Sequence, residues 1–234
     1  MADHSLLNSW AAAHTALLVE GQSRLSDVIG TDSPDWELNP STGLITLNGR
    51  RLQFALLGSV NEEGDSWTWS WADPDLDPQA IAVRRAQPLK RFGEESGLWE
   101  FTTPSFPMEG VTDLGMTPGA TISLVACPQI MGSAIFSGGS GFGGRLYTVL
   151  TDPLLTVEAP SAFTAPRFIS GALAYGLGAH RDIITVYAGA HQLQLEESPG
   201  QMTLIFEDQT RLEVIFDPLD RISTMRFAAN SLKD

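Results

Sequence analysis

The pattern that most limits the fold of this chain is an alternation of apolar and polar side chains over residues 36–72. Side chains of a strand point to opposite faces in turn, so a period of two predicts strands with one buried face. Turn compositions separate the alternating runs, and Asn48-Gly49 is a strong signal for a two-residue hairpin. We therefore predict a meander of four antiparallel strands.

Two flanking stretches have helical spacing instead. Over residues 5–29, apolar side chains recur at three- and four-residue steps, which predicts one helix with Ser5 as its N-cap. Residues 77–92 have similar spacing, and Asp77 is a favourable N-cap for them. Pro88 is expected to kink or divide this second helix, because proline removes a helical hydrogen bond.

The residue pattern in the middle of the chain predicts short strands and one helical or irregular stretch. A strand is expected around Trp99–Thr103, followed by a helical or irregular stretch over 107–131. Two further strands, at 133–137 and 145–150, are expected on either side of a glycine-rich turn.

The last third repeats the order of helix and then meander. A proline-rich linker over 155–166 precedes a predicted helix over 167–189, which the glycines at 176–178 are expected to break into two pieces. Four predicted strands follow, at 192–196, 201–207, 211–216 and 221–228. A duplication of the first part and an independent sheet built by the same physics both account for the repeat.

These elements predict an α+β protein with two domains. Residues 1–155 are expected to form an N-terminal helix with antiparallel meander sheets, and residues 160–234 a smaller unit of helix and meander, either as separate domains or packed as one compact unit. Hydrophobic residues make up 43% of the chain and charged residues 18%, which is too apolar for a disordered chain and enough for a sizeable core.

Charge narrows the class of partner. The 28 acidic and 14 basic residues give a net charge of −14, which argues against nucleic acid and anionic membranes because both need clustered cations. No signal-like start and no 18-residue apolar run is present, and the single cysteine, Cys127, cannot form an internal disulfide. We expect a cytoplasmic protein, and the preference for arginine over lysine is typical of GC-rich bacterial genomes.

Three segments carry a family resemblance. A Trp-x-Trp-x-Trp-Ala strand at Trp67–Asp73 follows Gly58-Ser59, a Gly-Leu-Trp-Glu-Phe-Thr-Thr-Pro-Ser-Phe segment spans Gly97–Phe106, and a glycine-rich hairpin spans Gly138–Asp152. Over about residues 5–152 the chain resembles the bacterial domain of unknown function 6882 family. The resemblance implies a fold and supplies no activity and no catalytic residues.

The tryptophans of that strand are candidate ligand contacts. Trp67, Trp69 and Trp71 share one face of a strand and could stack against a ring or a sugar. The favoured alternative is that they belong to the core, because each exposed ring would leave a large apolar area in water.

The glycine-rich turn formally matches GxGxxG at Gly139, Gly141 and Gly144. A dinucleotide site needs a helix after that motif, and a strand follows here, so nucleotide binding is disfavoured. The interpretation we prefer is a hairpin tip at which Gly141 and Arg145 contact an anion or another small ligand.

No other motif predicts chemistry. The carboxylates of Asp73-Pro-Asp-Leu-Asp77 lack the glycine and glutamate of a calcium loop and indicate a turn. The histidines form no metal-binding pair, and Cys127 lies in an apolar stretch that indicates an inert thiol. We predict no catalytic residue, no metal and no cofactor.

A basic group on the 77–92 helix is the remaining candidate surface. Arg84, Arg85 and Arg91 could contact an acidic partner, or they could simply form a solvated helix face. Together these observations favour a non-enzymatic binding or interaction protein, whose partner is another protein or a second copy in a homodimer. The alternative is a small-ligand sensor or enzyme with a cleft between the two units, near the 138–145 hairpin.

Overall fold

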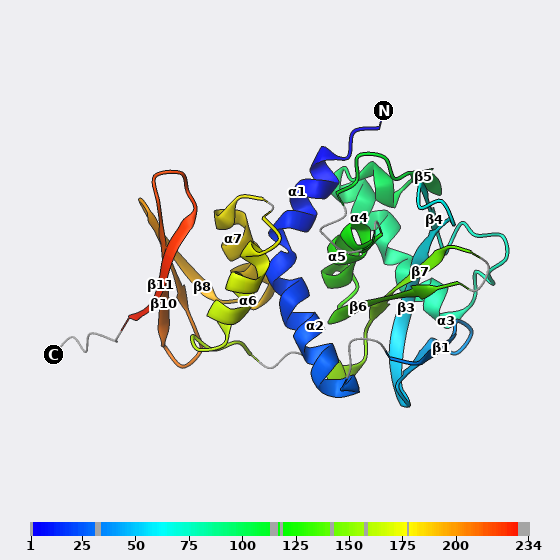
Figure 1. Cartoon of the computed structure of the whole chain (residues 1–234), viewed down its shortest axis with the longest axis horizontal. Coiled ribbons are helices and arrows are strands. Elements are labelled where there is room, and N and C mark those ends of the chain that lie inside the picture. Colours follow the sequence, from blue (N-terminus) through cyan, green and yellow to red (C-terminus); the bar gives the residue numbers. More distant parts are fainter. Residues whose placement is uncertain are drawn as a thin grey trace. The chain divides into compact units, whose positions relative to one another are not determined.

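The computed structural model describes residues 2–30, 34–112, 117, 119–140, 143–156, 159–176 and 178–228. The fold is α+β, with antiparallel sheets and helices as predicted (Figure 1). The chain divides into two compact units. The first consists of Met1–Ala11 and Gly21–Thr156, and the second consists of Ala12–Glu20 and Val157–Asp234.

The described residues of the first unit form a seven-stranded antiparallel sheet. Its strands are β1 (Trp36–Asn39), β2 (Leu44–Leu47), β3 (Arg50–Val60), β4 (Ser66–Trp69), β5 (Ser105–Pro107), β6 (Ala134–Gly139) and β7 (Arg145–Leu150). The order β1-β2-β3-β4-β5 confirms the predicted four-stranded meander, and β7 pairs with β3 and β6. Asn48 and Gly49 both have positive φ, as a type I′ hairpin between β2 and β3 requires.

The predicted single helix over 5–29 is wrong in one respect, because it is two helices. α1 spans Ser5–Ala13 and α2 spans Thr15–Ile29, with a break at His14. Ser5 is the first residue of α1 and not its N-cap, and its N–H donates to the carboxylate of Asp3 at 2.9 Å. The hydroxyl of Thr15 donates a hydrogen bond of 2.8 Å to the carbonyl of Ala12, which satisfies a group that the break would leave free. The apolar stripe is continuous across the break, so the spacing of apolar residues carried no sign of it.

The second predicted helix is divided at Pro88, as expected. α3 spans Ile81–Ala86 and α4 spans Pro88–Ser96. Asp77 does not cap α3, which begins four residues later. Its carboxylate instead accepts a hydrogen bond of 2.8 Å from the backbone N–H of Gln79, and so forms a turn.

The strand predicted around Trp99–Thr103 is also wrong. Trp99–Phe101 form a 3₁₀ helix, and the strand β5 begins at Ser105. The backbone N–H of Phe101 bonds to the carbonyl of Leu98, so hydrogen bonds close three residues apart here instead of across a ladder. The rest of the middle segment contains α5 (Ala120–Gln129), within the stretch predicted to be helical or irregular, and a short 3₁₀ turn at Pro153–Leu155.

The second unit has a helical layer and a four-stranded antiparallel sheet. α6 (Ala165–Leu173) and α7 (His180–Ala190) confirm the predicted division of the helix. The sheet has the order β11-β10-β9-β8, and its strands are β8 (Gln194–Ser198), β9 (Gln201–Ile205), β10 (Arg211–Phe216) and β11 (Ile222–Ala228). Alternate residues such as Leu212 and Val214 join the core of this unit. Glu213 lies on the other face, where it pairs with Arg226 at 2.6 Å.

A helix that crosses a membrane must be both long and apolar. Among the helices of the described residues, none combines the length and the apolar character that crossing a bilayer requires.

Candidate functional site

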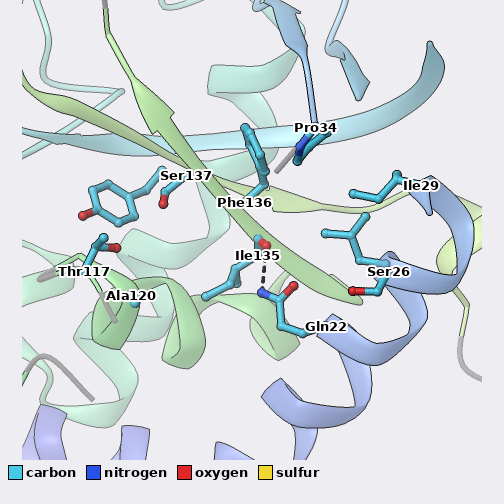
Figure 2. A pocket seen from close by; sticks show the side chains of 11 residues that line it. Gln22, Ser26, Ile29, Pro34, Thr117, Ala120, Ile135, Phe136 and Ser137 are labelled. Atoms are coloured by element: carbon cyan, nitrogen blue, oxygen red, sulfur yellow. Dashed lines mark hydrogen bonds between the residues drawn. The ribbon is translucent and has the colours of Figure 1, made fainter. Parts of the chain in front are cut away.

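A hollow of about 340 Å³ lies in the first unit beside β6. We call it the β6 hollow. Residues of α2, α5, β6 and β7 line it together with two loop residues: Gln22, Leu25, Ser26, Ile29, Pro34, Thr117, Ala120, Ile135, Phe136, Ser137 and Tyr147. Figure 2 shows Gln22, Ser26 and Ile29 on one side of this hollow and Thr117 and Ala120 on the other, with β6 residues between them.

The position of β6 in the sheet explains why a hollow forms here. β6 pairs with β7 on one side, and no other described strand pairs with it. The helix α2 passes close to the start of β6, and the side-chain N–H of Gln22 donates a hydrogen bond of 2.9 Å to the carbonyl of Ile135. That carbonyl therefore points away from β7, and the edge of the sheet opens into the hollow.

The lining suits an uncharged ligand. The lining mixes apolar side chains such as Ile29 and Phe136 with uncharged polar ones such as Ser26, Thr117 and Ser137 (Figure 2). None of the described lining residues carries a formal charge. An ionised ligand would lose its hydration there without gaining an opposite charge, which is costly.

Tyr147 gives the hollow its most unusual feature. Its side chain is 1% exposed, and its hydroxyl group has no hydrogen-bond partner among the described residues. The ring packs against Trp67, with centroids 5.4 Å apart, and an added Cβ on Gly119 would lie 2.6 Å from it. The ring is held firmly, so the hydroxyl group is fixed in place without a partner.

The predicted tryptophan face is divided between core and surface. Trp67 and Trp69 are 0% exposed, and their rings meet edge to face at 5.2 Å. The indole N–H of Trp69 donates a hydrogen bond of 2.7 Å to the carbonyl of Glu100. Trp71 is half-buried and stacks with Trp69, and the ammonium group of Lys90 lies 5.4 Å from its ring centroid. Of the three rings, only that of Trp71 keeps surface that a ligand could contact.

Part of the glycine-rich turn lies outside the described residues. Gly141 lies outside the described residues. Arg145 starts β7 and donates to the carbonyl and the hydroxyl of Ser137, at 3.4 and 3.2 Å. Arg145 also borders a second hollow of about 270 Å³, which Tyr147, Gly143 and Gly144 help to line. The structure therefore brings Arg145 next to two residues of the β6 hollow, Ser137 and Tyr147.

The three arginines of the basic group have different surroundings. Arg85 is half-buried, and its guanidinium donates to the carbonyls of Gly43 and Phe54, at 2.8 and 2.9 Å. It thereby ties α3 to the sheet. Arg84 is exposed on the same helix, and Arg91 on α4 forms an exposed pair with Glu95 at 2.7 Å. Contact with an acidic partner stays a prediction for these residues.

Two buried pairs of histidine and glutamate were missed by the sequence analysis. In the first unit, His4 Nδ1 lies 2.9 Å from Glu100 Oε1. In the second, His191 Nε2 lies 2.6 Å from Glu20 Oε2, and the hydroxyl of Tyr187 donates to Glu20 Oε1 at 3.3 Å. Burial, followed by the Glu20 carboxylate, raises the pKa of Tyr187 above its ordinary value. The partners are far apart in the sequence, so no local motif could reveal them.

His191 also borders a hollow of about 370 Å³ in the second unit, with Gln192, Gln194, Glu207 and Gln209 among the lining residues. In the part of the chain that the structure describes, no three histidine, cysteine, aspartate or glutamate side chains gather as a metal site would need.

Cys127 is expected to be unreactive in the folded protein. Burial raises the pKa of its thiol to about 12, so the thiolate at pH 8 should be roughly a thousandfold scarcer than for an ordinary cysteine thiol. Iodoacetamide labelling at pH 8, followed by mass spectrometry, should therefore be very slow in buffer and rapid in denaturing urea. Labelling at similar rates in both solvents would contradict this burial.

Comparisons with known proteins give one match. The model of a family described as a family of unknown function (DUF6882) matches residues 8–153. No curated protein and no solved structure matches the chain significantly.

Proposed function

The chain belongs to the family of unknown function DUF6882, and because membership brings no known activity, we propose from its geometry that it is a non-enzymatic binding protein whose site is the β6 hollow. The ligand is an uncharged, mainly apolar group that carries a hydrogen-bond acceptor. The acidic composition and the arginine bias support a role in the cytoplasm of a bacterium.

The buried hydroxyl group of Tyr147 is the observation that supports this most. A buried polar group without a partner costs about 1–3 kcal/mol, and among the seven such side-chain atoms of the described residues, that of Tyr147 belongs to a residue lining the β6 hollow. A ligand in the hollow could accept a hydrogen bond from this hydroxyl group. The apolar residues Leu25, Ile29 and Phe136 would then cover the rest of the ligand.

A matched pair of tyrosine variants tests the role of this hydroxyl group. We expect Tyr147→Phe to raise the free energy of unfolding by about 1 kcal/mol, because it removes an unpaired buried group. We expect Tyr187→Phe to lower it by about 1 kcal/mol or more, because that hydroxyl is bonded to Glu20. Urea unfolding of both variants measures these changes.

Binding is tested with the same two variants. A library of uncharged fragments is screened against the full chain by ligand-observed NMR, and the best fragment is titrated into each protein. Tyr147→Phe should weaken its binding at least fivefold, whereas Tyr187→Phe should leave it unchanged. If no fragment binds, or if the loss of the Tyr147 hydroxyl changes nothing, the β6 hollow is not the site.

A further inference from the structure

The outer edge of β6 carries backbone groups to which a further strand could bond. The backbone N–H of Ser140 bonds to the carbonyl of Gly144, which fixes the hydrogen-bonding register of β6 and β7. Bonded pairs alternate in an antiparallel ladder, so Ile135, Ser137 and Gly139 direct their N–H and C=O groups away from β7. The bond from Gln22 to the Ile135 carbonyl agrees with this direction.

Most of these outward groups are uncommitted. The Ile135 carbonyl is held by Gln22, and the Ser137 carbonyl receives only the long 3.4 Å contact from Arg145. No described residue bonds to the backbone N–H of Ser137 or Gly139. Their spacing of about 7 Å along the strand is that of the outward groups in any extended chain.

The helix α2 covers the start of this edge through the Gln22 bond to Ile135, but beyond it the described residues give the edge little of the usual protection against a further strand. Natural edge strands are blocked by charged side chains, prolines, bulges or a covering element. β6 reads Ala-Ile-Phe-Ser-Gly-Gly, with neither a charge nor a proline, and a side chain added at Gly139 would meet nothing within 4 Å.

The β6 hollow lies where an added strand would pair with β6. The three consecutive residues Ile135–Ser137 border it, so the hollow follows the strand over about 7 Å. Gln22 and Ile29 of α2 border one side and Ala120 of α5 borders the other (Figure 2). A strand placed there would extend the sheet and lie between these two helices.

We propose that the occupant of the β6 hollow is an extended segment of another polypeptide, which adds to β6 as a further antiparallel or parallel strand. This rests on the proposed binding function and names its ligand class. Alternate side chains of the segment would enter the apolar part of the hollow, and one of its carbonyls would accept from Tyr147 or from the Ser137 N–H. The net charge of −14 and the uncharged lining favour a segment without acidic residues.

The test begins with a phage-displayed library of random heptapeptides, selected on the full chain. The best peptide is synthesised with a fluorescent label, and its backbone nitrogens are methylated one at a time. Methylation at alternate positions should weaken binding at least tenfold and should be tolerated at the positions between. A loss without this alternation would overturn the proposal, because only strand pairing has a period of two.

Two variants at Ser137 separate the backbone from the side chain. Ser137→Pro removes the outward N–H, and an edge strand tolerates proline where the N–H lies outside the ladder. It should weaken peptide binding at least tenfold, and by clearly more than Ser137→Ala, which removes only the hydroxyl. Equal binding by all three proteins would contradict strand addition.

Amide hydrogen exchange in the wild-type chain tests the same proposal if Ser137→Pro does not fold. In the wild-type chain, saturating peptide should slow exchange of the Ser137 and Gly139 amides at least tenfold, and unchanged exchange would refute the proposal. Fragment binding without any peptide binding would overturn strand addition and leave the proposed function intact, whereas failure of both would remove both. A dimer in sedimentation that Ser137→Pro abolishes would identify a second copy as the occupant instead.

Discussion

Replacing Glu100 with alanine is expected to lower the free energy of unfolding by about 1–3 kcal/mol, the cost of leaving a buried polar group without its partner. The side chains of His4 and Glu100 are 0% and 2% exposed, and their hydrogen bond of 2.9 Å joins the N-terminal segment to the 3₁₀ helix Trp99–Phe101. The variant leaves the His4 imidazole buried without its acceptor, and it also leaves a cavity. Urea unfolding followed by tryptophan fluorescence measures the loss.

Two further variants serve as controls for Glu100→Ala. Arg91→Ala breaks a pair with Glu95 whose side chains are 81% and 61% exposed, and it should leave the free energy of unfolding nearly unchanged because water screens the pair. Glu100→Gln keeps an oxygen that can accept from His4, so it should cost less than Glu100→Ala. A cost below about 1 kcal/mol for Glu100→Ala would show that the buried pair contributes little.

Replacing Gly21 with alanine is expected to destabilise the protein by about 1–3 kcal/mol or more, although alanine is the better helix former by about 1 kcal/mol. Gly21 lies within α2, and an added Cβ would lie 1.9 Å from the carbonyl oxygen of Ser133. This neighbour is backbone and cannot rotate away, so α2 must shift from the start of β6.

The matched control is a glycine in another helix. Gly189 lies within α7, and an added Cβ there would meet nothing within 4 Å. Gly189→Ala should therefore stabilise the protein by about 0.5–1 kcal/mol, which is the ordinary helix preference. Thermal unfolding of both variants should give shifts of opposite sign. Stabilisation by Gly21→Ala would show that α2 and β6 are further apart than the structure places them.

Local patterns predicted the elements whose residues carry their own signal. Alternation and Asn48-Gly49 predicted the first meander, and Pro88 predicted a division between two helices. The errors occurred where hydrogen bonds outweigh apolar spacing. The break at His14 lies within a continuous apolar stripe, and Trp99–Phe101 has the alternation of a strand but forms a 3₁₀ turn.

The β6 hollow shows the same limit for function. Composition and motifs singled out two of its neighbours, Arg145 and Trp67. It did not reach Tyr147 or Gln22, because their roles depend on contacts between segments that are distant in the sequence. A tyrosine among the buried residues of a predicted strand was the only local sign, and it gave no information about a missing hydrogen-bond partner.

The two units are interleaved along the sequence. Residues 12–20 belong to the second unit, where Ala16 joins the core and Glu20 bonds to His191, although the rest of that unit begins at Val157. No single cut in a gene separates the two units. A truncated chain ending at Thr156 would keep Ala16 and Glu20 without the core and the histidine that satisfy them. A cut close to the end of the segment that the family model matches would therefore remove contacts that residues 12–20 make within the second unit.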